Sequence, residues 1–389
     1  MAARTAFVTG GTGFLGAFLI AYLLRRDSRV IALVRGPEPA RRLLEVLRAV
    51  DDEGGDGNRF QQSYDEGRLD VVEGNVAFPT LGLGETCLRN LAYEVDEIWH
   101  CAASFQSRQR FRDEITRHNV HGTENVLKFA KLCNKRKGAN LCFVSTAYVS
   151  PVVGKVGVEQ LPDPRLPPRN LYECSKREAE LLVDQYRREC RLPVSIARPS
   201  ILIGHSATGR SVGWNGYYAI VRALHRVKHV AQTAACGKFS GDLKLRVLAN
   251  PLARLNLVPI DYVVEALWHL SRAERRDSFI FNVTSSQPIT VAQCFAILCE
   301  ALGVTGVEVV DEESFRTHRM NRIERLFLRE ARFQLGYLRD DVDFDHTNFR
   351  QLVPKEILRD DQVTERLLHQ INMRCVAALE SDPPRRLSV

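Results

Sequence analysis

Tyr172 and Lys176 stand four residues apart at the start of a stretch with helical periodicity. Residues at positions i and i+4 lie on one face of a helix, so the phenol and the ammonium would share one site. A nearby cation favours phenolate and lowers a phenol pKa that is ordinarily ~10. A tyrosine tuned in this way can give or take the proton when hydride moves at a carbonyl carbon. The pair alone is also compatible with an ordinary exposed helix pair.

Two hydroxyls, Ser145 and Thr146, precede that pair by 26 residues, counted from Thr146, and follow an apolar run. They mark the carboxyl end of a predicted strand, which is where open α/β sheets place their ligands. We expect Thr146 to hydrogen-bond a substrate carbonyl oxygen and orient it toward Tyr172, with Ser145 as the competitor for this role. The simpler alternative for both is a strand-end hydroxyl that caps the next turn.

A glycine-rich turn, Thr-Gly-Gly-Thr-Gly-Phe-Leu-Gly, occupies residues 9–16, between the apolar runs 6–8 and 17–24. A helix N-terminus has unpaired N–H groups and a partial positive charge, so it binds phosphate. Gly10 can make the tight turn, Gly13 leaves room for a pyrophosphate, and Gly16 lets the helix pack close to the strand. In this strand–turn–helix context, the motif predicts dinucleotide binding rather than a plain turn.

Arg35 closes the second predicted strand, 19 residues after Gly16. An acidic residue here would bind the ribose 2′-hydroxyl of NAD, whereas a cation accommodates the 2′-phosphate of NADP. Arg42 adds positive charge on the following helix. The predicted cofactor is therefore NADPH. The alternative for both arginines is simple solvation at a strand end and on a helix surface.

Strand and helix signals alternate through the first half of the chain. The strands are nearly continuously apolar, as expected when both faces of a parallel sheet are covered. This pattern predicts an α/β fold, a Rossmann-type doubly wound parallel sheet. The expected strands are Thr5–Thr9, Val30–Arg35, Leu69–Glu73, Glu97–Ala102, Ala139–Ser145 and Val194–Arg198, and the expected helices are Gly13–Arg26, Pro39–Ala49, Asn119–Lys131 and Tyr172–Glu189.

The second half of the chain is less regular. We expect residues 1–204 to form the NADP-binding domain, to which 256–285 return with a strand–helix unit and a late strand. Residues 205–255 and 286–380 are expected to form a smaller substrate-binding lobe, with a helix near Trp214–Val227 and a mostly helical stretch over 286–360. Residues 381–389 are expected to form a flexible tail.

Composition narrows the class of protein. The 389 residues are 45% hydrophobic and 26% charged, as in an ordinary globular enzyme, and carry a net charge of +7. A basic surface suits a phosphorylated cofactor, a coenzyme A ester, an acidic carrier protein or nucleic acid, although arginine-rich composition alone would also produce it. No run of basic residues with interleaved aromatics occurs, so we expect no nucleic-acid partner.

Cysteine usage and apolar runs indicate the compartment. The ten cysteines, among them Cys142 and Cys236, are scattered without a C-x-x-C pair. They are expected to be reduced core residues of a cytoplasmic protein, and no metal site is expected. The N-terminal apolar stretch belongs to the fold rather than to a signal peptide, and no run approaches the ~18 residues of a membrane span. We therefore expect no integral membrane segment.

Taken in order, these motifs resemble those of an extended short-chain dehydrogenase/reductase. The resemblance spans about residues 5–285 and is specific in the order and spacing of its motifs rather than in any one of them. Its motifs are Thr9–Gly16, His100-Cys101-Ala102-Ala103, Asn119-Val120-His121-Gly122-Thr123, Ser145-Thr146-Ala147, Tyr172-x-x-x-Lys176, Arg198-Pro199-Ser200 and Leu257–Val263.

Several further short sequence segments resemble those of the thioester reductase branch, which has a male sterility type NAD-binding domain. That branch includes fatty acyl-CoA reductases and the terminal reductase domains of carboxylic acid reductases and nonribosomal synthetases. The segments are Val34-Arg35, Arg42-Leu43, Asn75-Val76, Pro79–Leu83, Leu91-Ala92, Val95–His100, Phe344-Asp345 and Asn348. The chain departs from the branch at Asn75, where Asp is usual, and at Leu171-Tyr172-Glu173-Cys174, where Gly-Tyr-Gly/Ala is frequent.

The resemblance implies roles for individual residues. Asn119 would support a relay of water and lysine, and Lys176 would hold the nicotinamide ribose and tune Tyr172, with Thr146 completing the catalytic set. The cofactor-binding set contains Gly10, Thr12, Gly13, Phe14, Leu15 and Gly16 at the pyrophosphate, Arg35 and Arg42 at the 2′-phosphate, Asn75 and Val76 along the adenine, Ala102 and Ala103 beside the ribose, and Ser145, Tyr172, Lys176, Pro199 and Ser200 near the nicotinamide.

The implied reaction is hydride transfer from NADPH to a thioester carbonyl, with Tyr172 and Thr146 stabilising the oxyanion. Collapse of the hemithioacetal expels the thiol and leaves an aldehyde, and a second hydride could carry it to the alcohol. The acyl thioester would arrive as a coenzyme A ester or on a separate acyl carrier protein. The basic segment Arg222–Lys244 is a candidate site for that anionic handle, or else a solvated face. We expect a monomer or homodimer.

Two other functions use the same residues. The first is an extended reductase of another kind, either a nucleotide-sugar epimerase or dehydratase or a ketoreductase acting on a free carbonyl. A sugar-nucleotide enzyme would usually carry an acidic residue in place of Arg35, which favours reduction. The second is a binding protein that senses dinucleotides. A sensor need not retain Thr146, Tyr172 and Lys176 together, so their presence favours an enzyme.

Overall fold

The computed structural model describes residues 4–51, 58–105, 109–165, 167–235, 239–273, 278–359 and 363–381. Three features discussed above lie wholly or partly outside the described residues. These are Cys236, residues 236–238 of the basic segment Arg222–Lys244, and residues 382–389 of the expected tail, whose first residue, Ser381, ends helix α14.

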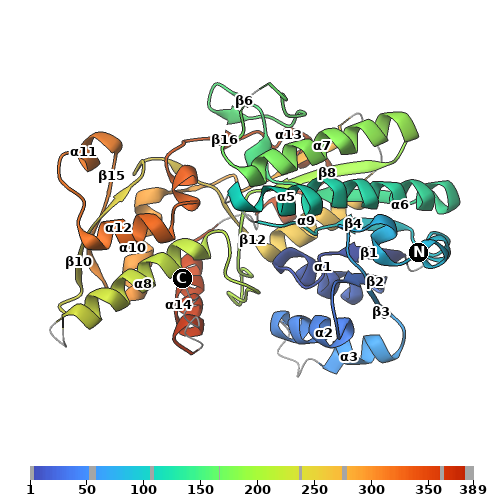
Figure 1. Cartoon of the computed structure of the whole chain (residues 1–389), viewed down its shortest axis with the longest axis horizontal. Helices are drawn as coiled ribbons and strands as arrows, with labels where there is room; N and C mark the ends of the chain where they lie inside the picture. The colour runs from blue at the N-terminus through green and yellow to red at the C-terminus, as the bar shows by residue number, and fades with distance from the viewer. Residues whose placement is uncertain are drawn as a thin grey trace.

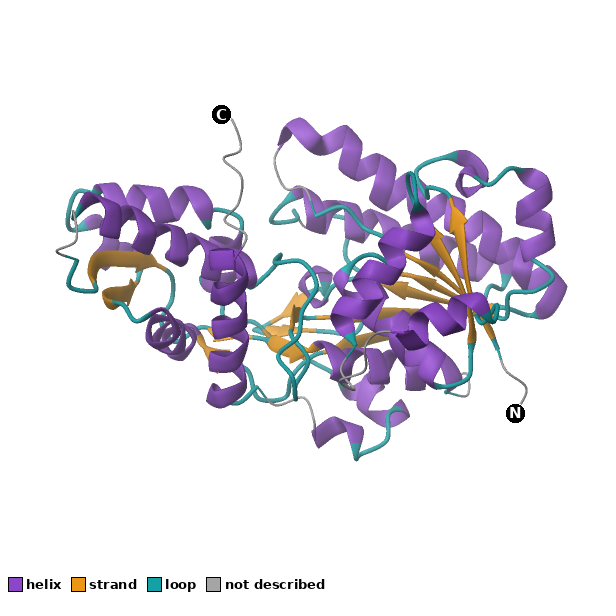
Figure 2. Ribbon diagram, turned by 90° about the horizontal axis from the view of Figure 1, so that it is seen from below, coloured by secondary structure: helices purple, strands orange, loops and turns teal. Residues whose placement is uncertain are grey.

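A seven-stranded parallel sheet forms the centre of the larger lobe (Figure 2). The order in which the chain adds strands switches sides between β1 and β4, and Thr9 of β1 pairs with Leu33 of β2 on one side and His100 of β4 on the other. This is the doubly wound Rossmann order, so the predicted fold class is confirmed. In spatial order the strands are β3 (Leu69–Glu73), β2 (Arg29–Val34), β1 (Thr5–Thr9), β4 (Glu97–His100), β5 (Asn140–Val144), β8 (Val194–Pro199) and β13 (Ile280–Val283).

Helices cover both faces of this sheet (Figure 1). Alternate strand residues point to opposite faces, so Val8 enters one core and Phe7 the other. The first core lies under α1 (Phe14–Arg25), α2 (Pro39–Val50), α3 (Asn58–Asp65) and α9 (Ile260–Arg272), and the second under α4 (Glu85–Leu91), α6 (Gly122–Lys137) and α7 (Leu171–Cys190).

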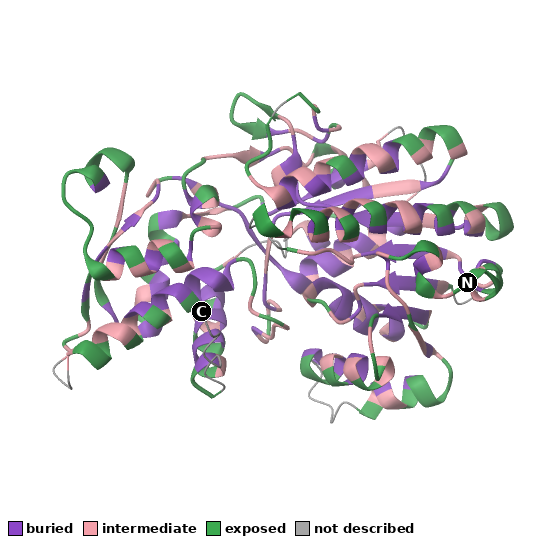
Figure 3. Cartoon of the chain, in the orientation of Figure 1, coloured by how far each residue is buried: buried purple, intermediate pink, exposed green. Residues whose placement is uncertain are grey.

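A separate buried cluster forms the smaller lobe (Figures 1 and 3). It contains α8 (Tyr218–Ala234), α10 (Val291–Leu302), α12 (Arg322–Glu330) and α14 (Glu365–Ser381), with strands β10 (Asp242–Leu248) and β15 (Thr305–Val310) in parallel. Helices make up most of the regular structure described over 286–360, as expected, but residues 305–310 form strand β15. The pairing joins segments far apart in the sequence, which local periodicity does not report.

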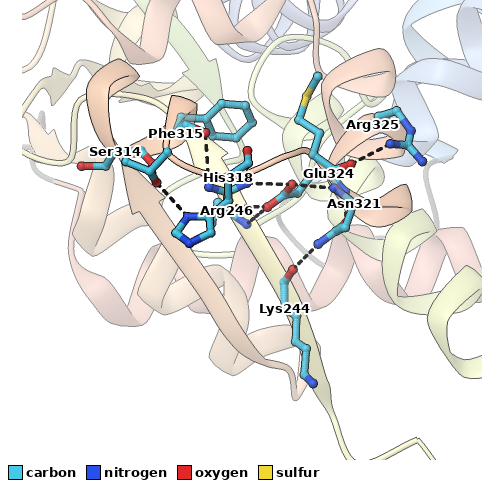
Figure 4. A network of polar contacts seen from close by, with 10 residues as sticks. Lys244, Arg246, Ser314, Phe315, His318, Asn321, Glu324 and Arg325 are labelled. Atoms are coloured by element: carbon cyan, nitrogen blue, oxygen red, sulfur yellow. Dashed lines mark hydrogen bonds and ion pairs between the residues drawn. The ribbon is translucent and has the colours of Figure 1, made fainter.

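A network of polar contacts joins a strand of the smaller lobe to two of its helices (Figure 4). Arg246 on β10 donates from Nε to Glu324 Oε1 over 2.7 Å, and from Nη1 to the Phe315 carbonyl over 3.2 Å. Asn321 and Glu324 cap α12 reciprocally. Glu324 is 2% exposed, and its charge is compensated by the Arg246 guanidinium and by the backbone N–H groups of Asn321 and Arg246, which donate to its carboxylate. This network joins β10 to α11 (Glu312–Arg316) and α12.

Residues 343–357 return from the smaller lobe to the sheet. Strand β16 (Asp343–Phe344) pairs with β7 (Val156–Gly157), and α13 (Thr347–Leu352) packs against β13. Phe349 is 1% exposed and belongs to the first sheet core. The expected lobe 286–380 is therefore interrupted by a stretch that packs with the larger lobe, because Phe349 and Val353 bury their apolar surface there. The other domain boundaries stay predictions.

Short elements complete the chain. The predicted helix at Asn119–Lys131 begins in a π-helical turn, Thr116–His121, and continues as α6, and the helix expected near Trp214 begins at Tyr218. Among the described residues no helix is both long and apolar enough to cross a membrane. The remaining elements are α5 (Arg112–Ile115), β6 (Val152–Val153), β9 (Ile201–Ile203), β11 (Arg254–Leu255), β12 (Leu257–Pro259) and β14 (Ile289–Thr290).

Candidate active site

The glycine turn joins β1 to α1 at the carboxyl edge of the sheet. Gly10 has φ +76°, and its carbonyl accepts a hydrogen bond from Gly13 N over 2.9 Å. A Cβ on Gly10 would lie 2.7 Å from Ala102 N, and one on Gly16 would overlap the Gly10 carbonyl. Gly13 is the N-cap of α1, whose first turn contains no acidic residue. The positive end of α1 therefore meets the edge without a side chain in front of it.

The next residues of the motif lie partly in the core. Leu15 is 8% exposed and belongs to the first sheet core, while Phe14 packs edge-on against Phe18 with ring centroids 5.7 Å apart. Thr12 is half-buried in the turn itself. Of these three residues, Thr12 and the backbone around Phe14 lie beside the exposed Gly13.

A buried hydrogen-bond network holds the ends of β1 and β4 together. His100 Nδ1 lies 2.8 Å from Thr9 Oγ1, and His100 Nε2 lies 3.0 Å from Thr123 Oγ1. Thr9 Oγ1 also accepts from Ala102 N over 3.3 Å. Burial, and next the charge of Lys176, lower the pKa of His100 to about 3, so its ring is neutral. This network sets Ala102 directly beside Gly10, and Ala103, which is half-buried, follows it.

A pocket of about 750 Å³ opens at the carboxyl ends of β2 and β3. It brings together Arg35, Arg42 and Asn75, three of the residues expected to bind the cofactor. Arg42 Nη1 donates to the Arg35 carbonyl over 2.5 Å, and Asn75 Oδ1 accepts from Ala77 N over 3.0 Å. The pocket also contains Glu73 and Phe78, which sequence reasoning missed, and Gly36, Gly74 and Gly82.

Val76 lies next to this pocket but packs inward. Its side chain is 7% exposed. Its Cγ2 atom lies 3.0 Å from the point where a Cβ on Gly122 would stand. Its carbonyl accepts from Asn125 Nδ2 over 2.9 Å. Val76 is thus a core residue that anchors the loop after β3 on α6, and only its backbone is near the pocket wall formed by Asn75.

Asn119 ties three segments together. It lies in the π-helical turn, 2% exposed, and its Oδ1 accepts from Ser104 N over 2.7 Å. Its Nδ2 donates to the Ser104 carbonyl over 3.0 Å and to Ser175 Oγ over 2.9 Å. Ser175 Oγ donates in turn to the Tyr172 carbonyl over 2.8 Å. Asn119 therefore positions the first turn of α7, and π-helical turns often occur at functional sites.

Tyr172 and Lys176 are both buried in the first two turns of α7. Lys176 Nζ donates to the Val144 carbonyl over 2.7 Å and lies 4.6 Å from the centroid of Phe143. Burial lowers the pKa of Lys176 to about 8, against the opposing charge of Glu180. The helix thus joins the site to the end of β5.

The pKa of Tyr172 moves in the opposite direction from the one expected. Burial, followed by the negative charge of Glu173, raises it above the ordinary value. The phenol is only 8% exposed, so loss of hydration disfavours phenolate, while the Lys176 ammonium is directed at the Val144 carbonyl. Tyr172 is therefore a protonated phenol here, suited to donate a proton.

Phe105 is a second residue that sequence reasoning missed. Its ring stacks on Tyr172 with centroids 4.9 Å apart and an interplanar angle of 29°, yet it is 59% exposed. The Asn119–Ser104 hydrogen bonds hold the backbone immediately before it. Phe105 is thus an exposed aromatic ring held against the ring of Tyr172. No local pattern marked it, because the contact depends on the loop after β4.

The hydroxyls at the ends of β5 and β8 differ in their contacts. Thr146 Oγ1 accepts from Tyr148 N over 3.4 Å and caps a short helical turn, which is the alternative role considered for it. Ser145 Oγ and Ser200 Oγ are buried and, within the described part of the chain, without a hydrogen-bond partner. Pro199 ends β8 opposite Val283. Buried hydroxyls of this kind call for a partner, such as a ligand.

Metal and thiol chemistry find little support in the described part of the chain. Among residues 4–381, apart from the undescribed gaps, no group of three or more His, Cys, Asp or Glu side chains could hold a metal ion. The described cysteines are free thiols, and burial raises the pKa of Cys101, Cys133 and Cys294 to about 12. Such thiols are inert, since the reactive form is thiolate.

Comparisons with known proteins identify the family of the chain. The sequence model of the family described as male sterility protein, an NAD-binding family, matches residues 8–267. The non-canonical nonribosomal peptide synthetase cpsA of Aspergillus campestris is 30% identical over 288 residues, which cover 71% of this chain and 25% of that protein. The glycine betaine reductase ATRR of Emericella nidulans is 29% identical over 308 residues, covering 75% and 22%.

A solved structure supports the fold. The terminal R domain from the myxalamid PKS-NRPS biosynthetic pathway superposes with a TM-score of 0.72 at 24% identity, covering 98% of this chain and 91% of that chain. The chain spans about a quarter of the length of the two curated relatives.

Proposed function

Because the chain belongs to the NAD-binding family described as male sterility protein, we propose that it is an NADPH-dependent reductase of acyl thioesters. The observation that carries the proposal is the chain of hydrogen bonds from Asn119 through Ser175 to the Tyr172 carbonyl, which fixes the start of the helix that presents a buried, protonated phenol at the carboxyl edge of the sheet. Relatives named as a nonribosomal peptide synthetase and a glycine betaine reductase support reductive chemistry at an activated carboxyl group.

The residues present fit a bound dinucleotide. The glycine turn leaves no space for side chains at Gly10 and Gly16, and the N-terminus of α1 can receive a pyrophosphate. The unpartnered hydroxyls of Ser145 and Ser200 suit the nicotinamide end. The pair Arg35 and Arg42 in one pocket supports a 2′-phosphate, and hence NADPH rather than NADH.

The reduction would proceed through this chain's own side chains. NADPH, when bound, supplies the hydride. The hydroxyls of Tyr172 and Thr146 would donate hydrogen bonds to the thioester carbonyl oxygen, where negative charge develops. Tyr172 would then give its proton to that oxygen, and Lys176 would return one through the relay that includes Asn119. Collapse of the hemithioacetal breaks the C–S bond, so the thiol leaves and an aldehyde remains.

Charge and composition support a carrier for the acyl group and a cellular location for the protein. A net charge of +7 suits an anionic handle, either coenzyme A or an acyl carrier protein. On the expected basic segment, Arg222 and Arg226 lie on α8, and Arg226 pairs with Glu330 at 3.3 Å. The described cysteines are free thiols, which supports a reducing, cytoplasmic location. We retain monomer or homodimer as the predicted state.

The test is a panel of acyl-CoA and acyl-pantetheine thioesters offered with NADPH, with cofactor consumption and free thiol measured together. We expect thiol release in step with NADPH oxidation, one NADPH for each thiol if the aldehyde is the product and two if the alcohol is. NADPH oxidation without thiol release would indicate a ketoreductase. Conversion of UDP- or GDP-sugars without net NADPH loss would indicate an epimerase or dehydratase.

A further inference from the structure

Glu173 is a buried carboxylate directly after Tyr172. It is 3% exposed and lies in the first turn of α7, at the position where the chain departs from the Gly-Tyr-Gly/Ala pattern. A charged group is rarely buried unless it is paired and hydrogen-bonded. The contacts of Glu173 therefore indicate what this residue does.

Its contacts come from the residues before α7 and from the other end of the chain. Asn170 caps the helix by accepting from Glu173 N over 2.9 Å, and Arg169 N donates to Glu173 Oε2 over 3.3 Å. Arg169 Nε lies 3.7 Å from the same oxygen. The phenol of Tyr337 hydrogen-bonds the Glu173 carboxyl group and accepts from Asn170 Nδ2 over 2.9 Å. Asn170 Nδ2 also donates to Glu173 Oε1 over 3.4 Å, so four groups hold one carboxylate.

Tyr337 also reaches the second catalytic segment. It lies in a short helical turn, Gln334–Leu338, that follows α12 in the smaller lobe. Its ring meets Tyr148 edge-on with centroids 4.7 Å apart, and Tyr148 is two residues beyond Thr146. The guanidinium of Arg169 lies 5.5 Å from the Tyr148 ring and 5.4 Å from the Tyr337 ring. One aromatic side chain therefore contacts the segments that carry both Thr146 and Tyr172.

We propose that Glu173 is a positioning residue: its carboxylate, held by Tyr337, ties the start of the catalytic helix to the smaller lobe and keeps a negative charge beside the Tyr172 phenol. The proposal rests on the assignment of Tyr172 as the proton donor. In this arrangement, docking of residues 334–344 sets the geometry of Tyr172 and Thr146 together, and the charge keeps Tyr172 protonated for its role as an acid.

The charged and titratable groups around the pair agree with this role. Tyr172 is affected by Glu173 on its own helix and faces Tyr337 from the smaller lobe. Lys176, one turn further on, is directed at the Val144 carbonyl. Glu173 faces Tyr337, Tyr148 and Arg169, and Arg169 in turn pairs with Asp340 at 3.2 Å. Burial raises the pKa of Glu173 above its ordinary value, and the charge of Arg169 and the hydrogen bonds from Tyr337 and Asn170 oppose that rise by stabilising the carboxylate.

Three variants separate charge from contact. Glu173→Gln keeps hydrogen-bonding groups for Tyr337 and the backbone but removes the charge. Glu173→Ala removes both, and Tyr337→Phe keeps the ring against Tyr148 but removes the hydroxyl. Glu178→Gln and Glu178→Ala are the matched controls, because Glu178 is exposed on the same helix. Each protein is assayed for kcat and KM across pH, and for hydrogen exchange in peptides covering 334–344.

We expect kcat to fall about 10- to 100-fold in Glu173→Ala, with KM for NADPH within about twofold of wild type, because misplacing a reacting group lowers kcat. In Glu173→Gln the alkaline limb of the pH profile should move down by roughly half a pH unit or more, since the nearby negative charge is gone. Exchange in 334–344 should quicken in Glu173→Ala and Tyr337→Phe. The Glu178 variants should match wild type throughout.

The outcomes distinguish this proposal from the proposed function. If wild type is active and the Glu173 variants match the Glu178 controls in kcat and pH profile, Glu173 has no positioning role. If wild type releases no thiol from any thioester, the proposed function fails. Hydrogen exchange alone then tests whether Glu173 holds residues 334–344 against the start of α7. Unchanged exchange over 334–344 in Glu173→Ala would overturn the positioning role of Glu173, and faster exchange there would support that role.

Discussion

At the scale of single residues, the chemistry depends on protonation states set by burial. Tyr172 is kept as a neutral phenol by desolvation, and Lys176 has its pKa lowered to about 8 by the same cause. His100, with its pKa lowered to about 3, stays neutral between Thr9 and Thr123. A proton donor that remains protonated in the resting protein suits carbonyl reduction, in which the substrate oxygen gains a proton.

The first prediction concerns that donor. Tyr172→Phe should lower kcat about 10²- to 10⁴-fold, the usual contribution of a positioned general acid, and leave NADPH affinity within about threefold. Tyr186→Phe, the same change further along α7, should retain wild-type activity. The measurement is thiol release and NADPH oxidation with a turned-over thioester. If Tyr172→Phe stays within about threefold of wild type, another group donates the proton.

The second prediction concerns cofactor choice. Arg35→Asp should weaken NADPH binding by roughly 10- to 100-fold, the value of one or two charge-assisted hydrogen bonds, and weaken NADH binding much less. Arg41→Asp is the control, because Arg41 is exposed on α2 and pairs with Glu38 and Glu45 outside the pocket. Dissociation constants for both cofactors are compared by fluorescence titration. An equal loss for NADPH and NADH would exclude a 2′-phosphate role.

At the scale of elements, the site exists because parallel strands end at one edge of the sheet. The turn after β1, the loop after β4 and the first turn of α7 meet there through backbone contacts of Gly10 and side-chain contacts of Asn119. The close approach of Gly16 to the Gly10 carbonyl sets how near α1 comes to the phosphate position.

The third prediction tests that approach. In Gly16→Ala the new methyl group overlaps the Gly10 carbonyl, so α1 must shift away from the turn. The overpacking should lower the free energy of unfolding by about 1–3 kcal/mol and weaken NADPH binding at least about tenfold. Gly336→Ala is the control, since nothing lies within 4 Å of a Cβ built there. Melting temperature and NADPH affinity are measured for both, and similar values for the two variants would contradict the packing argument.

At the scale of the whole molecule, Glu159 joins parts of the chain that are far apart in sequence. Its Oε1 accepts from Asn282 N over 2.8 Å, and its Oε2 accepts from Asn348 N over 2.6 Å. The side chain is 7% exposed, and burial raises its pKa to about 7 despite these donors. It therefore connects β13 of the sheet to the stretch that returns from the smaller lobe.

The fourth prediction follows from this raised pKa. The folded state holds the Glu159 proton more tightly than the unfolded chain, whose ordinary pKa is 4.5. Its contribution to the free energy of unfolding is therefore fully present below about pH 4.5 and is lost as pH rises through about 7. In denaturant unfolding, the free energy of unfolding of wild type should fall relative to that of Glu159→Gln as pH rises through about 7, because Gln does not titrate. The exposed Glu313→Gln should show no such trend, and a constant difference for Glu159→Gln would refute the linkage.

Much of the larger lobe was predictable from sequence because its signals are local. The apolar run before Gly10, the strand ending at Val34 and the helix carrying Tyr172 and Lys176 all follow from periodicity and turn chemistry within a few residues. The meeting of Arg35, Arg42 and Asn75 in one pocket also follows, since each comes directly after, or on the helix after, a parallel strand.

The sequence by itself therefore determined the Rossmann fold, the glycine turn and the residues available for hydride chemistry, because short-range patterns encode strand, turn and helix. Only the tertiary structure decided the parallel pairing of β10 with β15, the return of residues 343–357 to the sheet and the contact of Phe105 with Tyr172. It also decided the direction of the Tyr172 pKa shift. Burial and long-range contact are properties of the packed chain, and no window of sequence contains them.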